Sequence, residues 1–384
     1  MIDLIKFELY KIFSKKSVRI VLLLTVLFSA FNAFGESINM KSKGLNSMND
    51  VYSVMKEHEG KVIIQEGILK AENTIEKLKE KEKRGEKLTK EEIVYRYYLY
   101  EVMITDPVYM VNNEYYTIDE IKDEISTLEN NNKTDTYEYK NLNFVYEKVK
   151  NIEESKYYFK SGWISTTDFN VIATLITTLI VVGLATIFSD EYQNNSAQIM
   201  LSCKRGKNKL VLSKILTGLI YTVIMFTIVN GTYMLGALKF DFTGWDKPLE
   251  LFKYYRNTPF DMRVIDFYIT GLGVSFIGAM LFSLVTMLVS LLVRNNMISL
   301  LLSLGMYYVP TFVSGFIPID SMARVLREIN LAEAVRIEGM FINPSTYNIL
   351  GNPTLYSTVL ISLVVISIPV VIYLIRYFGK RQAI

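Results

Sequence analysis

Residues 190–214 (DEYQNNSAQIMLSCKRGKNKLVLSK) bring two acids, a run of small polar residues and five cations together between two uncharged stretches. Ile199, Met200 and Leu201 add an apolar ridge in the middle of the segment. A short helix with such a ridge and flanking charges fits a groove on another protein. The alternative is an anchor whose cations only bind lipid phosphates. That alternative explains the cations, but it leaves the acids and the Asn/Gln run unexplained.

No catalytic or phosphate-binding pattern accompanies this segment. The chain has no GxxxxGK[ST] loop for nucleotide phosphates, no HExxH and no GxSxG. Cys203 and His58 are its only cysteine and histidine, which excludes a disulfide framework and histidine clusters. We therefore expect no enzyme activity, catalytic residue, metal site or cofactor in this chain. Energy for any transport must come from a partner.

Apolar runs predict that the segment is held between membrane-spanning helices. About 20 apolar residues are needed to cross the hydrocarbon core. The 15-residue first run reaches this length if Lys15, Lys16 and Arg19 extend their charges to the interface, giving a first span at 17–35. A signal peptide is the alternative, but no small-x-small cleavage pair follows. The chain is thus predicted to be a mainly α membrane protein with six transmembrane helices, at Ile20–Phe34, Phe169–Phe188, Ile215–Leu238, Phe267–Val293, Asn295–Ile319 and Thr354–Ile375.

The distribution of Lys and Arg predicts the orientation of these spans. Six spans place both termini, the 190–214 loop and Arg294 on one side, with 14 Lys/Arg against four Asp/Glu. The short loops on the other side, 236–266 and 317–353, hold eight Lys/Arg against nine acids. Because basic loops stay in the cytoplasm, both termini and the 190–214 loop are predicted to be cytoplasmic.

The segment before the first span alternates apolar residues with lysines. Residues 1–16 (MIDLIKFELYKIFSKK) have this pattern, which predicts a helix lying in the cytoplasmic interface. A frayed beginning of the first span is the alternative.

Residues 36–168 form a predicted extracellular domain with 20 Lys/Arg and 26 Asp/Glu. Helical periodicity around Ile68–Leu78 stops at Gly85 and restarts behind a Thr89/Glu92 capping box. A second box, Thr117/Glu120, opens another helix. Two or three helices in a hairpin are predicted, with strand structure possible at Val108–Thr117.

Tyrosines are concentrated in this domain. An aromatic surface for a hydrophobic or amphipathic cargo is one interpretation, since tyrosine combines apolar area with a polar group. The other is that the rings fill the core of a small domain. On the first interpretation, the candidate cargo contacts are Tyr97, Tyr98, Tyr109, Tyr115 and Tyr116.

The 190–214 segment resembles the corresponding loop of ABC-2 type transporter permeases of Gram-positive bacteria. These carry an acid-aromatic step, a small polar stretch, a Leu-Leu-Ser-like turn and a basic run after the second span. Asn195 stands where a glycine is often found, and the turn lacks a proline common in the family. The matching residues are Glu191-Tyr192, Asn195-Ser196-Ala197, Met200-Leu201-Ser202, Lys204-Arg205-Gly206-Lys207 and Lys214.

The resemblance implies a permease that works as a dimer, with a second identical or homologous copy. Each copy would dock on a separate cytoplasmic ATP-binding subunit, in which ATP and Mg²⁺ bind. The resemblance makes 190–209 the coupling loop, with Glu191, Tyr192, Asn195, Ser196, Met200, Leu201, Lys204, Arg205 and Lys207 as ATPase-coupling residues. It also makes 317–353 a partly re-entrant external loop within the 169–384 core.

The leading hypothesis is therefore the permease subunit of an ATP-driven exporter in the cell membrane. Its apolar spans suit amphipathic or lipophilic cargo, such as antimicrobial peptides, in contact with membrane lipids. A membrane-anchored sensor whose outside domain binds a ligand is one alternative, and a lipid or polysaccharide exporter is another. No nucleic-acid partner is expected.

Overall fold

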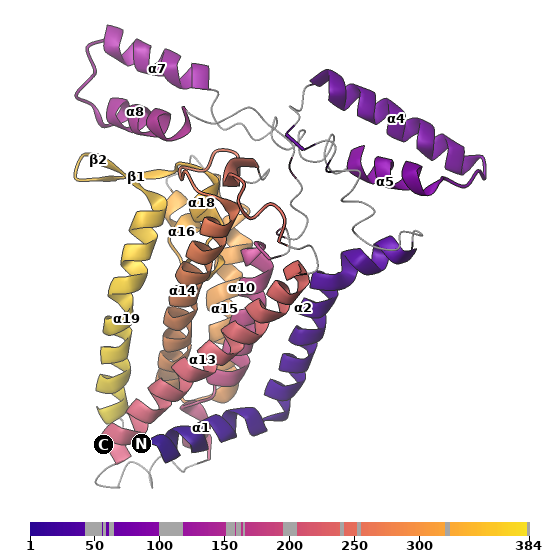
Figure 1. The fold of residues 1–384 in the computed structure, drawn as a ribbon. Helices are drawn as coiled ribbons and strands as arrows, with labels where there is room; N and C mark the ends of the chain where they lie inside the picture. The colour runs from indigo at the N-terminus through magenta and orange to yellow at the C-terminus, as the bar shows by residue number, and fades with distance from the viewer. Residues whose placement is uncertain are drawn as a thin grey trace.

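A computed structural model describes the chain over 1–42, 56, 59–60, 65–99, 118–150, 158, 163, 166–194, 206–238, 242–251, 255–318 and 323–381. Long helices in a bundle make up most of it (Figure 1). Six of them are long and apolar enough to cross a membrane, which confirms the predicted mainly helical, six-span architecture. These are α2 (Lys16–Ser42), α10 (Phe169–Leu184) together with α11 (Ser189–Gln193), α13 (Gly206–Leu238), α14 (Val264–Val293), α15 (Asn296–Ser314) and α19 (Tyr356–Arg381).

The two ends of the bundle differ in what they carry (Figure 1). One end holds both termini and the short helix α1 (Ile2–Ser14), which lies across the base. α11 lies at this end too, because Glu191 is ion-paired with Lys11 of α1. Lys15 between α1 and α2 has an extended backbone, so α1 is a separate helix and not the start of the first span. The opposite end holds the other short helices and a two-stranded sheet.

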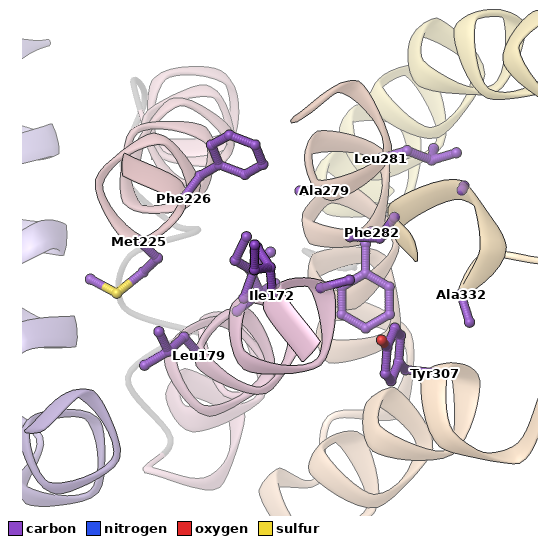
Figure 2. Packing of buried hydrophobic residues seen from close by; sticks show 14 of the residues in the cluster. Ile172, Leu179, Met225, Phe226, Ala279, Leu281, Phe282, Tyr307 and Ala332 are labelled. Carbon is purple, nitrogen blue, oxygen red and sulfur yellow. The ribbon is translucent and has the colours of Figure 1, made fainter. Parts of the chain in front are cut away.

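α10 lies at the centre of the bundle, where it contacts α2, α13, α14 and α15. Figure 2 shows Ile172 and Leu179 of α10 between Met225 on one side and Phe282 on the other. Phe282 packs edge-on against Tyr307 of α15, with ring centroids 6.0 Å apart. Large side chains from α13, α14 and α15 thus pack around α10.

The span boundaries on either side of the 190–214 segment differ from the predicted ones. α10 ends at Leu184 rather than Phe188, and a turn separates it from α11. The Ala185 carbonyl in this turn accepts a hydrogen bond from Ser299, which replaces a helical partner. α13 begins at Gly206 rather than Ile215, because its first polar turns continue the helix below the apolar part. Its 33 residues correspond to about 50 Å.

Residues between the first two spans form two helical hairpins in the described regions. α4 (Gln65–Lys83) pairs with α5 (Lys90–Tyr98) through the Lys81–Glu92 ion pair of 2.8 Å. The Thr89/Glu92 capping box is confirmed, and Gly85 has the predicted breaking role, with a φ of 80°. Thr117 and Val108–Thr117 lie outside the described residues.

The second hairpin corrects the predicted number of helices. α7 (Ile118–Asn130) packs on α8 (Tyr137–Val149), so the described residues of 36–168 include four helices rather than the predicted two or three. α8 was not predicted from the sequence, although Leu142, Val145 and Val149 recur at helical spacing. These three residues and Ile121 and Leu128 form the buried core of the hairpin.

The loops at this end complete the fold. A short 3-10 helix, η2 (Leu249–Leu251), precedes α14. Three short helices follow α15 and lead to an antiparallel hairpin in the register Thr346 opposite Leu355. The middle helix is buried against α10, α14 and α19. These elements are α16 (Arg324–Glu328), α17 (Glu333–Arg336), α18 (Gly339–Ile342), β1 (Thr346–Ile349) and β2 (Asn352–Leu355).

Candidate functional site: a buried ion network at the base of the bundle

Lys214 is the centre of a charged cluster at the end that carries both termini. Its ammonium is fully buried, 2.7 Å from Glu191 Oε1 and 3.2 Å from Glu8 Oε2. It also donates a 2.7 Å hydrogen bond to the Ile187 carbonyl. Lys214 belongs to α13, Glu191 to α11 and Glu8 to α1, so the Lys214 side chain joins three helices.

A second lysine completes the network. Lys11 of α1 lies 3.2 Å from Glu191 Oε1 and 3.6 Å from Glu8 Oε2, and it is partly exposed. Burial lowers the pKa of the Lys11 ammonium, but the two carboxylates outweigh this and raise the pKa above its ordinary value. Two cations and two carboxylates therefore balance one another. Removing either buried partner would leave a charge without compensation.

The neighbouring acid links the network to α15. Asp190 lies 3.9 Å from the ammonium of Lys15, and it accepts a 3.1 Å hydrogen bond from the Asn296 side chain. Burial lowers the pKa of Lys15, with Asp190 acting in the opposite direction. Ser189 donates a 2.6 Å bond to Asn296. α11 is thus tied to the first residue of α15 as well as to α1 and α13.

The network closes the segment that the sequence singles out. Glu191 precedes and Lys214 follows the stretch 195–205, and their ion pair fastens the two ends together. Through Glu8, the same network also joins these ends to α1. Three helices, α1, α11 and α13, are therefore connected at one point.

The predicted coupling residues fall into two groups. Glu191 is buried in the network, and Tyr192 lies beneath the Arg294 guanidinium, 5.1 Å from its ring centroid. Lys207 lies in the first turn of α13, and the position of its side chain is not among the described parts. The remaining coupling residues lie outside the described residues: Asn195, Ser196, Met200, Leu201, Lys204 and Arg205.

The structure does not test the tyrosines that are predicted as cargo contacts. Tyr97 and Tyr98 lie at the end of α5, and their side chains are not among the described parts. Tyr109, Tyr115 and Tyr116 lie outside the described residues.

Glu8, Lys11 and Lys214 are site residues that sequence reasoning did not single out for coupling. Glu8 stands between apolar neighbours on a helix where Leu9 and Ile12 face the bundle, and an acid on that face signals a buried partner. The partner itself is 206 positions away in the chain. No spacing within one segment could have identified it.

A second polar cluster lies at the opposite end. Glu338 accepts hydrogen bonds from the backbone and side chain of Asn170, at the beginning of α10. Arg336 donates a 2.6 Å bond to Asn170 Oδ1 and a 3.0 Å bond to Glu333. Burial and the nearby Asp168 carboxylate raise the pKa of Glu338 to about 8. This cluster fastens α17 and α18 to the end of α10.

The six-span bundle with its charged base defines a multi-pass membrane protein. Over residues 16–378 the chain matches the family described as ABC-2 family transporter protein, and it belongs to that family. It is therefore a transport permease, a membrane component of a transporter. No curated protein and no solved structure matches the chain.

Proposed function

We propose that the chain is the permease subunit of an ATP-driven exporter, powered by a separate ATP-binding subunit that docks on residues 190–209. The observation that carries this proposal is the buried network of Glu8, Lys11, Glu191 and Lys214 beside that segment. Membership of a transporter family supports an ATP-binding partner. A pull on the loop would reach α1, α11 and α13 together.

The proposed orientation places both termini in the cytoplasm and the two helical hairpins outside. Figure 1 supports it, because α1 and both termini lie at one end and α4, α5, α7 and α8 at the other. Native Cys203 provides an inside marker. In intact cells we expect a membrane-impermeant maleimide to leave Cys203 unlabelled and to label Lys87→Cys in a Cys203→Ser background. The reverse pattern would overturn the orientation.

Docking is tested by co-purification of an ATP-binding subunit with this chain. We expect reversal of three loop cations (K204E/R205E/K207E) to reduce the bound subunit about tenfold, since charge reversal removes attraction and adds repulsion. The matched control reverses three cations of α4 (K77E/K79E/K83E), at the other end of the molecule. Equal recovery with both variants would contradict docking at this loop.

The proposed cargo is amphipathic or hydrophobic, such as an antimicrobial peptide. No Asp, Glu, Lys or Arg occurs in 169–189, 215–238 or 295–319, and charged cargo would need polar or charged groups along its path. Cells that express the chain with its ATP-binding partner should tolerate a higher concentration of such a peptide. A Walker-lysine variant of the partner is the control, and equal tolerance in both strains would contradict export of that cargo.

A further inference from the structure

The face of α15 that turns toward the bundle is polar. Its buried residues are Ser299, Ser303 and Tyr307, all of which carry hydroxyl groups. Large apolar side chains point outward instead, with Met297 72% and Phe312 71% exposed. Apolar residues on the outer face are usual for a membrane span. The inner face of α15 differs, because it contacts the neighbouring helices through hydrogen bonds as well as through apolar packing. The polar positions recur every three or four residues at Asn296, Ser299, Ser303, Tyr307, Thr311 and Ser314.

α10 and the turn after it present a matching row. Ser189 bonds to Asn296 at 2.6 Å, and the Ala185 carbonyl accepts from Ser299 at 2.5 Å. Nearer the other end, the hydroxyl of Thr178 lies 2.9 Å from that of Tyr308. Thr174 pairs in the same way with Tyr307, at 3.0 Å. The numbers fall along one helix as they rise along the other, so the helices are antiparallel and share a hydrogen-bonded ladder.

One rung of this ladder lacks a partner. Ser303 is fully buried, and its hydroxyl makes no hydrogen bond among the described residues. It lies between Ser299 and Tyr307, whose hydroxyls are both bonded to the α10 side. A buried hydroxyl without a partner is unfavourable, yet this row carries one in its middle.

A second register would give Ser303 a partner. Moving α15 by four residues, about 6 Å, toward the end with the termini brings Ser303 to the Ala185 carbonyl that Ser299 now occupies. The same movement brings Thr311 to the place of Tyr307, whose partner is Thr174, and it brings Ser299 toward Ser189. A shift along the axis does not turn the helix, so the large apolar side chains stay on its outer face in both registers.

We propose that α15 shifts along α10 by one helical turn, and that Ser303 is the positioning residue that stabilises the shifted register. The exposed turn at Arg294 moves with it. Asn296 gives the shift its connection to the base, because it bonds both Ser189 and Asp190 of α11. Assigning the shift to transport rests on the proposed function. The exchange of hydrogen-bond partners does not.

Cysteine pairs in a Cys203→Ser background test the two registers in native membranes. A185C/S299C reports the observed register, and T174C/T311C reports the shifted one. T174C/V313C is the matched control, since Val313 lies on the exposed side of α15. S189C/S290C verifies the contact between α11 and α14, because the two native hydroxyls are 3.4 Å apart.

We expect both register pairs to form disulfides and the Val313 pair to form at least fivefold less. Adding Ser303→Ala should lower the yield of T174C/T311C severalfold, while Ser303→Thr should restore it, because the shifted register needs a hydroxyl at this position. A T174C/T311C yield no greater than that of the Val313 pair, with S189C/S290C formed normally, would overturn the proposal. Neither cargo nor an ATP-binding partner is needed, so this result is independent of the docking test.

Discussion

Lys214 illustrates why a cation is retained in a fully buried position. Two carboxylates and a carbonyl surround its ammonium at 2.7–3.2 Å, and the Phe188 ring centroid lies 5.3 Å away. Such a pair adds little net stability compared with apolar packing, but breaking it is costly. Its advantage is specificity, because only one arrangement of α1, α11 and α13 satisfies all the charges.

Replacing Lys214 tests this arrangement. Lys214→Met leaves two buried carboxylates with Lys11 alone, and we expect a loss of about 3–5 kcal/mol in unfolding free energy. Lys209→Met is the matched control, because Lys209 is exposed on the same helix. Its effect should stay within about 0.5 kcal/mol. Unfolding of the two variants in detergent micelles, followed by circular dichroism, measures the difference, and equal midpoints would contradict the network's role.

Glu338 predicts a pH dependence. Its pKa of about 8 in the folded chain lies above its ordinary value of about 4.3, so proton binding favours the folded state. This stabilisation is complete below about pH 4.3 and is lost as the pH rises through 8. Asp168 and Glu333 oppose the ionised form, whereas Arg336 favours it.

Glu338→Gln keeps this position neutral at every pH. Between pH 6 and pH 9 we expect the Tm of the original chain to fall relative to that of the variant, by about 2–4 °C for each kcal/mol lost. Thermal unfolding of both proteins across this range measures the change. Parallel Tm curves would show that Glu338 does not titrate there.

At the scale of elements, α17 depends on a close approach to α14. Ser275 donates a 2.8 Å hydrogen bond to the Val335 carbonyl, and one turn further along α14 Gly278 lies against the Ala334 carbonyl. A side chain at 278 would collide with that backbone. The short helix is therefore held deep between α10 and α14 by the absence of a Cβ atom.

Gly278→Ala should push α17 away and cost about 1–3 kcal/mol. Gly273→Ala on the same helix is the control, because nothing lies within 4 Å of the added Cβ. There we expect a neutral or slightly stabilising effect, since alanine favours helix over glycine. Unfolding midpoints compare the two, and similar behaviour of both variants would contradict the close contact.

Thr346 of β1 connects the α7–α8 hairpin to α16. Its hydroxyl bonds to Asn141 and lies 3.4 Å from the Tyr137 hydroxyl, while its carbonyl accepts a 3.1 Å bond from Arg324. Thr346→Val removes the hydroxyl bonds only. The lost hydrogen bonds contribute about 1 kcal/mol to stability. We therefore expect roughly fivefold faster amide exchange in α8, measured by mass spectrometry. Thr354→Val in the paired strand is the control, and unchanged α8 exchange in the Thr346→Val variant would contradict the connection.

The spans and the family could be predicted from the sequence because a membrane demands long uncharged runs, which are visible in any one segment. The inner extension of α13 could not, since its polar turns at 206–214 resemble a loop. The ion network could not either. Glu8, Glu191 and Lys214 are distant in the chain, and only the packing of α1 across α10 and α13 brings their charges together.

At the scale of the whole molecule, acidic and basic residues are distributed unevenly along the chain. Residues 36–168 hold an excess of six acids, and the rest of the chain is correspondingly basic. The two polar clusters cap opposite ends of α10, one facing the 190–209 loop and the other α17 and α18. These clusters fasten both ends of α10 to neighbouring helices.

ATP hydrolysis by the complex of this permease with its ATP-binding subunit, reconstituted in lipid nanodiscs, is the most direct test. We predict that Glu191→Ala lowers the hydrolysis rate about tenfold while the subunit stays bound. The reason is that the variant loses the ion pair with Lys214, through which the proposed coupling passes. Glu72→Ala on α4 should leave the rate unchanged. A Glu191→Ala complex that hydrolyses ATP as fast as the original would contradict the claim that energy enters through this network.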